Sequence, residues 1–271
     1  MPSNPKYRRP LNSNQVETLE LLYKFRFGSV DLIREYFKKS SRGLIFSRLK
    51  VLEEQGFIAK RFDSFYRIQG KPAAYYLLPS GARKLQETRS SEDDVVNIKS
   101  IYKDKTVSET FIQHSLSIFT VYNQLKAQYG DELAFFTKTN LTSYEHFPKP
   151  LPDAFVSLET KSSTRYFFIE IVEDSQPFFT AVRCIKKYLD HKESGEWAIT
   201  ETEYPAILFI CESISLQKRL QKQTTKMLNA SWVDSLVFAT ATKSELASLT
   251  ENDAIWQKVT EPDDKLSLQD I

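Results

Sequence analysis

The chain has 271 residues, of which 41% are hydrophobic and 27% are charged, a composition typical of a soluble globular protein with one or two domains. The longest apolar runs are far too short to cross a membrane, and no apolar segment follows the basic residues near the start, so we expect neither a membrane span nor a signal peptide. The two cysteines, Cys184 and Cys211, exclude a disulfide framework and show no metal-ligand spacing, which predicts reduced thiols in a cytoplasmic protein.

The net charge of +2 hides a strong difference between the two ends of the chain. Residues 1–90 contain 18 lysines and arginines against 8 acidic residues, a balance of +10. Residues 91–271 contain 19 against 27, a balance of −8. A basic front part indicates an anionic partner, and the contrast predicts two domains with different roles.

Residues 1–10 form a basic, proline-containing arm that we expect to be disordered, and three short helices are predicted after it. Asn12 or Ser13 caps the first helix, and Ser29 caps the second. The third helix covers residues 40–56 and ends at a glycine, which can adopt the left-handed conformation of a helix C-terminus.

The third predicted helix has two different faces. Its buried face consists of apolar residues spaced by four and three positions, namely Ile45, Leu49 and Leu52. Its outward face carries Arg42, Phe46, Ser47 and Lys50. A helix of this width fits the major groove of B-DNA. We therefore expect the arginine, serine and lysine to contact bases or phosphates and the phenylalanine to contact a thymine methyl group.

A hairpin is predicted directly after this helix, with strands over residues 57–63 and 73–78 and a turn over 68–72. It carries the phosphate-binding candidates Lys60, Arg61, Arg67 and Lys71. Three helices with tight joints followed by a hairpin are typical of a winged helix-turn-helix domain, here over residues 11–88, which predicts double-stranded DNA as the partner. The alternative is an ordinary amphipathic helix followed by a hairpin.

The second half begins after a polar stretch, residues 89–105, that we expect to be a linker. A helix over 106–128 and a strand over 133–137 are followed by a hairpin of two apolar runs, 151–158 and 165–172. If the turn is centred between residues 161 and 162, facing residue numbers sum to 323.

This register places Asp153 opposite Glu170, on one face of the hairpin. Like charges in facing positions destabilise a sheet unless something positive lies between them. A divalent cation such as Mg²⁺, which prefers oxygen ligands, is one solution. A lysine or arginine is the other.

The remaining elements alternate between helices and strands. We expect a helix over 177–192, a strand over 206–211, a basic helix over 216–228, a strand over 235–240 and a short helix from 244. This order predicts an α/β domain with a mixed sheet over residues 106–256, followed by a loose acidic tail over 257–271. His146 and His191 have polar neighbours and are expected at the surface.

The runs SRLKVLEEQGFIAKR and YYLLPSGARKL, together with PDA and IEI in the second half, resemble the replication-relaxation proteins of plasmids and other mobile elements. The second half also resembles the restriction-endonuclease-like fold, whose motif is Pro-Asp, a spacer, then Asp or Glu, any residue, and Lys. Pro152-Asp153 and Glu170 match the first two parts, but Val172 replaces the lysine that helps to activate water in that family. Lys186 or Lys187 could substitute, and Lys187 is our candidate.

The resemblance implies a winged helix-turn-helix followed by a restriction-endonuclease-like mixed-sheet domain that has lost cleavage. We expect a cytoplasmic DNA-binding protein that acts in replication or relaxation, without a cofactor and without membrane contact. Replication or relaxation proteins and a second copy of the chain are candidate partners. One alternative is a metal-dependent endonuclease that uses Asp153 and Glu170 with Mg²⁺ and a displaced lysine. The other is a transcription regulator whose second domain senses or dimerises.

Overall fold

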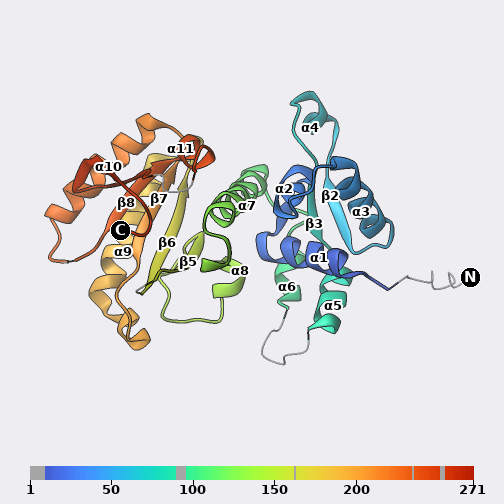
Figure 1. Cartoon of the computed structure of the whole chain (residues 1–271), viewed down its shortest axis with the longest axis horizontal. Helices are drawn as coiled ribbons and strands as arrows, with labels where there is room; N and C mark the ends of the chain where they lie inside the picture. Colours follow the sequence, from blue (N-terminus) through green and yellow to red (C-terminus); the bar gives the residue numbers. More distant parts are fainter. Residues whose placement is uncertain (1–9, 90–95, 162, 234, 251–253) are drawn as a thin grey trace, which may run out of the picture. The chain divides into compact units, whose positions relative to one another are not determined.

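The computed structural model describes residues 10–89, 96–161, 163–233, 235–250 and 254–271 (Figure 1). The chain forms two compact units, Met1–Thr120 and Val121–Ile271. The expected disordered arm therefore lies almost entirely outside the described residues. None of the helices in the described part of the chain is both long and apolar enough to span a lipid bilayer.

The first unit begins with three helices and a short strand, in the order α1 (Ser13–Phe25), β1 (Phe27–Gly28), α2 (Val30–Tyr36) and α3 (Arg42–Glu54). The predicted caps are confirmed. The Asn12 side chain accepts a hydrogen bond from the Gln15 amide, and the Ser29 hydroxyl accepts one from the Leu32 amide. Each cap satisfies an amide group that has no partner within its own helix.

The inward face of α3 is packed as the sequence predicts. Ile45, Leu49 and Leu52 are fully buried. The chain leaves the helix through Gly56, whose φ of +73° is the left-handed conformation that favours glycine. The opposite face of α3 is therefore left on the surface.

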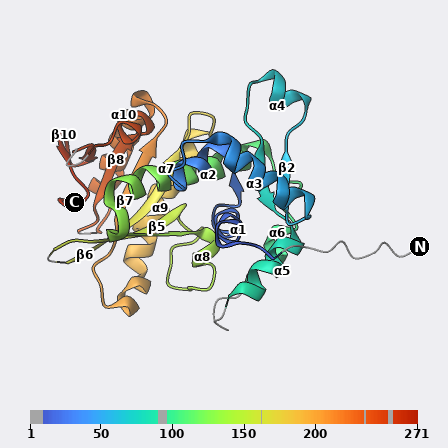
Figure 2. The ribbon, with the colours of Figure 1, turned by 45° about the vertical axis from the view of Figure 1, so that its right-hand side comes forward.

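The wing consists of three elements, β2 (Ile58–Arg61), α4 (Ser64–Ile68) and β3 (Ala74–Leu77). Strand β3 pairs antiparallel with both β1 and β2, which gives the order β1-β3-β2. Helix α4 lies at the far end of the wing strands (Figures 1 and 2). The prediction of a first strand extending to residue 63 is wrong because Asp63 accepts a hydrogen bond from the Tyr66 amide and starts α4 instead.

Two helices, α5 (Pro79–Thr88) and α6 (Ile98–Ile101), follow the wing. The described part of the expected linker, residues 96–105, is packed rather than free. Val96 and Ile101 are buried, and the buried Asp104 carboxylate forms an ion pair with Arg26 of the segment that follows α1. Burial raises the pKa of Asp104 above its ordinary value, although Arg26 opposes this shift. Two buried apolar residues and one ion pair thus hold this polar segment against the rest of the first unit.

Helix α7 (Glu109–Tyr129) contains the boundary between the two units. The elements after it are η1 (Gly130–Glu132), β4 (Leu133–Thr137), α8 (Lys138–Leu141), β5 (Ala154–Glu159), β6 (Thr164–Val172), α9 (Phe178–Ser194), η2 (Glu196–Thr200), β7 (Ala206–Cys211), α10 (Ile214–Asn229), β8 (Phe238–Thr242), α11 (Lys243–Ala247), β9 (Trp256–Lys258) and β10 (Glu261–Leu266). This order confirms the predicted alternation of helices and strands.

The second unit is built on a seven-stranded mixed sheet with the order β10-β9-β8-β7-β6-β5-β4. Strands β4, β5 and β6 are antiparallel neighbours, whereas β6, β7 and β8 are parallel. Helices α9 and α10 pack on one face through a core that includes Phe168, Ile185 and Leu220. On the other face, Tyr122 of α7 contacts Phe135 of β4. A helix, three antiparallel strands, a helix and a parallel strand form the restriction-endonuclease-like core that the sequence predicts.

The segment after residue 255 is part of the sheet, which corrects the expectation of a loose tail. Trp256 is fully buried and starts β9, which pairs antiparallel with β8. Strand β10 pairs with β9, and Leu268 beyond it is also fully buried. Three of the four acidic residues of this segment, Glu261, Asp263 and Asp264, lie on the exposed strand β10. The acidic composition therefore does not reveal the buried residues Trp256 and Leu268 on either side of this strand.

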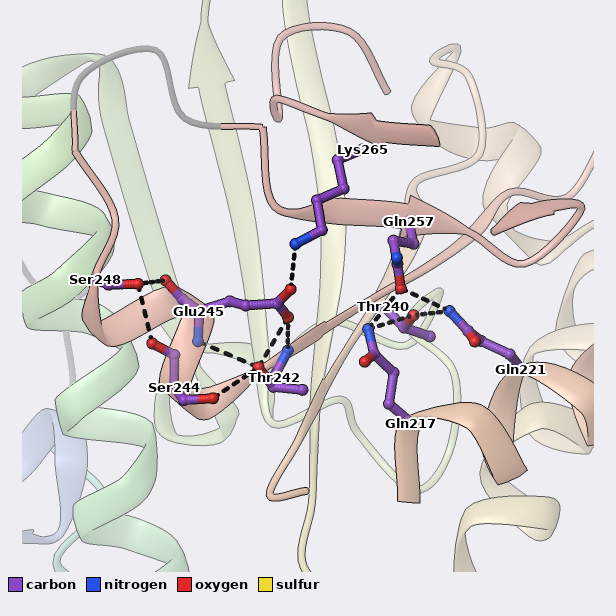
Figure 3. A network of polar contacts seen from close by, with 9 residues as sticks. All are labelled: Gln217, Gln221, Thr240, Thr242, Ser244, Glu245, Ser248, Gln257 and Lys265. Carbon is purple, nitrogen blue, oxygen red and sulfur yellow. Dashed lines mark hydrogen bonds and ion pairs between the residues drawn. The ribbon is translucent and has the colours of Figure 1, made fainter. Parts of the chain in front are cut away.

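A polar network joins α10 to strands β8 and β9 (Figure 3). The side-chain amides of Gln217 and Gln221 donate to the Thr240 hydroxyl at 3.2 and 2.9 Å and to Gln257 Oε1 at 3.0 and 3.1 Å. In the same figure, Glu245 accepts hydrogen bonds from the Thr242 amide and from Lys265. Because buried polar groups need partners, this network fixes the position of the final hairpin against the sheet.

His191 is buried, which corrects its expected surface position. Its Nε2 lies 3.0 Å from the carbonyl oxygen of His146 and its Nδ1 lies 2.8 Å from the Tyr204 hydroxyl. Because the carbonyl can only accept, Nε2 carries the proton and Nδ1 accepts from the tyrosine. This pattern holds the ring neutral. Burial lowers the pKa of His191 below its ordinary value, although the carbonyl of His146 opposes the shift.

We expect His191 to make the protein less stable in mild acid. In the unfolded state a histidine takes up a proton near pH 6.5. The folded state binds that proton only at lower pH, so the free energy of unfolding falls as the pH drops from about 6.5 toward the lowered folded pKa. Urea unfolding between pH 7.5 and 5 measures this loss. The variant His191→Gln should lack this contribution, whereas His146→Gln should retain most of it, because burial is the largest cause of the lowered His191 pKa and the hydrogen bond from His191 goes to the backbone carbonyl of His146.

Candidate functional site

The outward face of α3 and the wing enclose a groove of about 860 Å³, here called the helix–wing groove. Four cations line it, namely Arg42, Lys60, Arg67 and Lys71. Phe46 of α3 and Phe62 of the wing add exposed aromatic surface to the same groove. The structure thus brings together five of the eight residues for which we predict DNA contact.

The cations of this surface are held by weak ion pairs. Arg42 lies 3.2 Å from Asp31, and Lys60 lies 2.9 Å from Glu53. The hydrogen bond from Lys60 to Glu53 raises the pKa of the lysine, so its charge is retained at neutral pH. Pairs between such exposed or partly exposed groups contribute little to stability. A phosphate group can therefore replace the carboxylates at small cost.

The other predicted contacts differ in their positions. Lys50 is exposed on α3, 3.9 Å from Glu54, and Ser47 is exposed beside it. Neither lines the helix–wing groove. Arg61 points elsewhere, because its Nη1 donates to the carbonyl oxygens of Lys105 and Val107 at 3.0 and 3.3 Å. These bonds tie β2 to the segment before α7 and make Arg61 the least available of the predicted phosphate ligands.

The second candidate site is the pair of carboxylates on β5 and β6. The register of these strands has Ala154 opposite Ile169 and Glu159 opposite Thr164, which confirms the predicted sum of 323. Asp153 directly precedes β5, so continuing the register by one residue places it opposite Glu170. Both residues lie on the face of the sheet that α9 covers. The sequence therefore placed both carboxylates correctly.

A lysine neutralises each carboxylate. Lys138 Nζ donates to Asp153 Oδ1 at 2.7 Å, and the Ile171 amide donates to Asp153 Oδ2 at 2.9 Å. Lys187 Nζ donates to Glu170 Oε1 at 2.6 Å. The sequence leaves open whether a divalent cation or a basic side chain compensates the two carboxylates, and in the structure a lysine binds each of them.

The pair formed by Glu170 and Lys187 is shielded from water. Their side chains are only 12% and 7% exposed. The fully buried Tyr188 donates its hydroxyl proton to Glu170 Oε1 at 2.6 Å. Burial and the charge of Glu170 raise the pKa of Tyr188 and of the neighbouring Cys184 well above their ordinary values, so both remain protonated.

Lys138 and Tyr188 were not predicted from the sequence. Strand β4 pairs with β5 so that Thr137 faces Ala154. Continuing this register by one residue places Lys138 beside Asp153. The sequence predicts the strand over 133–137, but residue spacing does not specify its pairing with β5. Burial lowers the pKa of Lys138, yet the charges of Asp153 and Glu170 outweigh it and raise that pKa overall. The lysine therefore remains a cation.

The carboxylate pair does not fit a divalent-cation site. Mg²⁺ requires oxygen ligands with free lone pairs. Here Lys138 and the Ile171 amide bind the two oxygens of Asp153, and Lys187 and Tyr188 both bind Glu170 Oε1. The two lysines would also repel another cation. In the part of the chain that the structure describes, there is also no group of three or more His, Cys, Asp and Glu side chains able to hold a metal ion.

The fold and these two surfaces define a two-unit protein with a winged helix and a restriction-endonuclease-like sheet. The family model for replication-relaxation proteins matches residues 19–205, more than half of the chain. The chain therefore belongs to the replication-relaxation family. No curated protein gives a significant match.

Solved structures show more distant similarity. A double mutant of ZitR from Lactococcus lactis is 19% identical, with 47% of this chain and 83% of that chain covered and a TM-score of 0.27. Restriction endonuclease FokI bound to DNA is 12% identical, with 86% of this chain and 43% of that chain covered and a TM-score of 0.30. FokI alone is 13% identical over the same shares, with a TM-score of 0.33. The chain thus spans less than half the length of FokI.

Proposed function

We propose that this protein binds double-stranded DNA through its winged helix and acts in the replication or relaxation of a plasmid or other mobile element. The helix–wing groove carries this proposal, because it combines an exposed helix face with four cations, of which Arg42, Lys60 and Lys71 form weak ion pairs. Membership of the replication-relaxation family supports the second part.

In the proposed complex, α3 enters the major groove and the wing follows the phosphate backbone. Arg42, Ser47 and Lys50 contact base edges or phosphates from the outward face of α3. Phe46, which is exposed on the same face, contacts a thymine methyl group. Lys60, Arg67 and Lys71 of the wing neutralise phosphates without reading the sequence. Arg61 contributes less, since backbone carbonyls already hold its guanidinium.

The restriction-endonuclease-like unit is proposed to assist without cleaving DNA and without a metal cofactor. Cleavage requires a lysine or water-activating group that reaches solvent and substrate. The side chain of Lys187 is instead 7% exposed and held by Glu170. This unit then contributes by contact with DNA, with a replication or relaxation protein, or with a second copy of the chain.

Neutralising the outward cations is expected to weaken binding to duplex DNA at least tenfold. The test variant is Arg42→Ala/Lys50→Ala/Arg67→Ala, which removes two positive charges from the outward face of α3 and one from the wing. Its plot of log affinity against log salt should be shallower by about three, because each phosphate contact contributes a slope of about −0.9. Gel shifts or fluorescence anisotropy with a random-sequence duplex at several salt concentrations measure both quantities.

The matched control is Lys84→Ala/Lys99→Ala/Lys103→Ala, which removes the same charge from other surface positions of the first unit. It should bind duplex DNA nearly as well as the wild type. Equal losses in the two variants would mean that only net charge matters and would contradict a role for the helix–wing groove. Binding confined to one promoter operator, with no effect on plasmid replication, would favour the transcription-regulator alternative.

Metal-dependent cleavage is a second candidate function, favoured by the register that aligns Asp153 with Glu170 and by the contact of Glu170 with Lys187. It predicts that supercoiled DNA is nicked or cut with Mg²⁺ or Mn²⁺ and that Asp153→Ala and Glu170→Ala abolish this activity. We expect the wild type to leave supercoiled DNA intact under these conditions. Cutting that depends on both carboxylates would overturn the proposal of an inactive unit.

A further inference from the structure

The second unit carries a basic groove between α9 and α10, here called the α9–α10 groove, with a volume of about 930 Å³. Its cations are Arg183 from α9 and Arg219, Lys222 and Lys226 from α10. Helix α10 contains no acidic residue. None of the four cations forms an ion pair with a carboxylate among the residues that the structure describes.

This absence of partners distinguishes the α9–α10 groove from the helix–wing groove. Lys222 and Lys226 are four residues apart on one helix, where like charges repel and destabilise the helix. Their repulsion is relieved when an anion binds between or beside them. A polyanion would therefore stabilise this arrangement, and its negative charges match the run of cations along α10.

Aromatic surface lies among these cations. Phe178 packs against the core of the second unit, and the Arg219 guanidinium lies 3.8 Å from the centre of its ring. Phe179 is 54% exposed, with the Arg183 guanidinium 4.8 Å from its ring centre. Exposed phenyl rings and guanidinium planes are the surfaces on which unpaired bases stack.

We propose that the α9–α10 groove binds single-stranded DNA. Phosphates contact Lys222 and Lys226, and bases stack on Phe179 and on the Arg219 plane that Phe178 supports. A duplex does not satisfy the aromatic part of the groove, because its bases are stacked on one another and present only their edges. The site uses no residue of the helix–wing groove or of the carboxylate pair, so it does not depend on duplex binding by the winged helix.

The test is fluorescence anisotropy of a labelled oligothymidine of about 20 nucleotides with the full-length chain, since stacking platforms of this kind contact roughly 4–16 nucleotides. The variant Arg219→Glu/Lys222→Glu/Lys226→Glu should bind at least tenfold more weakly, with a salt slope shallower by about two. Phe179→Ala should weaken binding about tenfold and leave the salt slope unchanged, because it removes stacking and no charge.

A control for charge reversal away from the groove is Lys161→Glu in the turn between β5 and β6, at the opposite end of β6 from the start of α9. It should bind the oligonucleotide within about twofold of the wild type. Thermal unfolding midpoints of the groove variants should stay close to that of the wild type, because these cations form no ion pair with the described residues and the variants lose only the cation–ring contacts at Phe178 and Phe179.

Three outcomes would overturn the proposal. The first is equal binding of the oligonucleotide by the wild type and the triple groove variant. The second is full retention of binding by Phe179→Ala, which would leave a purely electrostatic surface. The third is a loss, in the groove variants, of binding to a hairpin duplex or to polyglutamate that exceeds the loss for oligothymidine, which would assign the groove to a duplex or to an acidic protein.

Discussion

Replacing Lys187 with methionine is expected to lower the free energy of unfolding by about 3–5 kcal/mol, the usual cost of removing one partner of a buried ion pair. Lys187 and Glu170 are both almost inaccessible to water, and their charged atoms are 2.6 Å apart. Methionine fills a similar volume but leaves the Glu170 carboxylate with two neutral donors, the Tyr188 hydroxyl and the Cys184 thiol, and with no cation in place of Lys187. Urea unfolding at pH 7, followed by circular dichroism, measures the loss.

Two further variants separate charge from packing at this position. In Glu170→Gln/Lys187→Met the uncompensated charge is absent, so most of the stability should return. The exposed neighbour Lys186 provides the matched control, and Lys186→Met should change stability by no more than about 0.5 kcal/mol. A loss in Lys187→Met that persists in the double variant would show that packing, and not the buried charge, dominates.

Replacing Gly81 with alanine is expected to destabilise the first unit by about 3 kcal/mol, the upper part of the range for overpacked sites. A β-carbon at this position would lie 2.3 Å from the carbonyl oxygen of Phe57 and 2.8 Å from Leu77 Cδ1. The Phe57 oxygen is backbone and accepts a hydrogen bond from the Leu78 amide, so it cannot move away without disturbing the base of the wing. Thermal or urea unfolding of the full chain measures the effect.

Gly43 supplies the matched control, because it is also a helical glycine of the first unit. A β-carbon there would meet only the Ser41 hydroxyl, at 3.6 Å, an ordinary contact. Gly43→Ala should therefore raise stability by about 0.5–1 kcal/mol through the higher helix propensity of alanine. If Gly81→Ala behaved in the same way, the close approach of α5 to the wing would not constrain this position.

The sequence predicted the local features of this protein accurately where periodicity and capping decide structure. The caps Asn12 and Ser29 and the buried face of α3 follow from residue type and spacing alone. The β5–β6 register follows from the length of a polar turn between two apolar runs, and it places Asp153 beside Glu170. These features depend on contacts between residues that are close in the sequence, so the spacing of residue types within one segment is enough to predict them.

The predictions from the sequence are wrong where a side chain is buried against a segment that is distant in the sequence. Residues 96–105 and 256–271 have polar or acidic compositions, yet Val96, Asp104, Trp256 and Leu268 are buried against elements far away in the chain. His191 has polar sequence neighbours but lies between Tyr204 and the carbonyl of His146. Composition averages over a segment and does not show that one or two of its side chains fill a core.

Residue types and their spacing are enough to identify the family, the winged helix with its outward cations, and the pairing of two carboxylates on one hairpin. The groups that compensate those carboxylates depend on contacts between distant segments, because Lys138 reaches Asp153 through the β4–β5 pairing and Lys187 reaches Glu170 from α9. The tertiary structure also places Arg219 of α10 over Phe178 of α9, which gives the basic helix its aromatic partner. Both results follow from strands and helices packed side by side, an arrangement that residue spacing within one segment cannot specify.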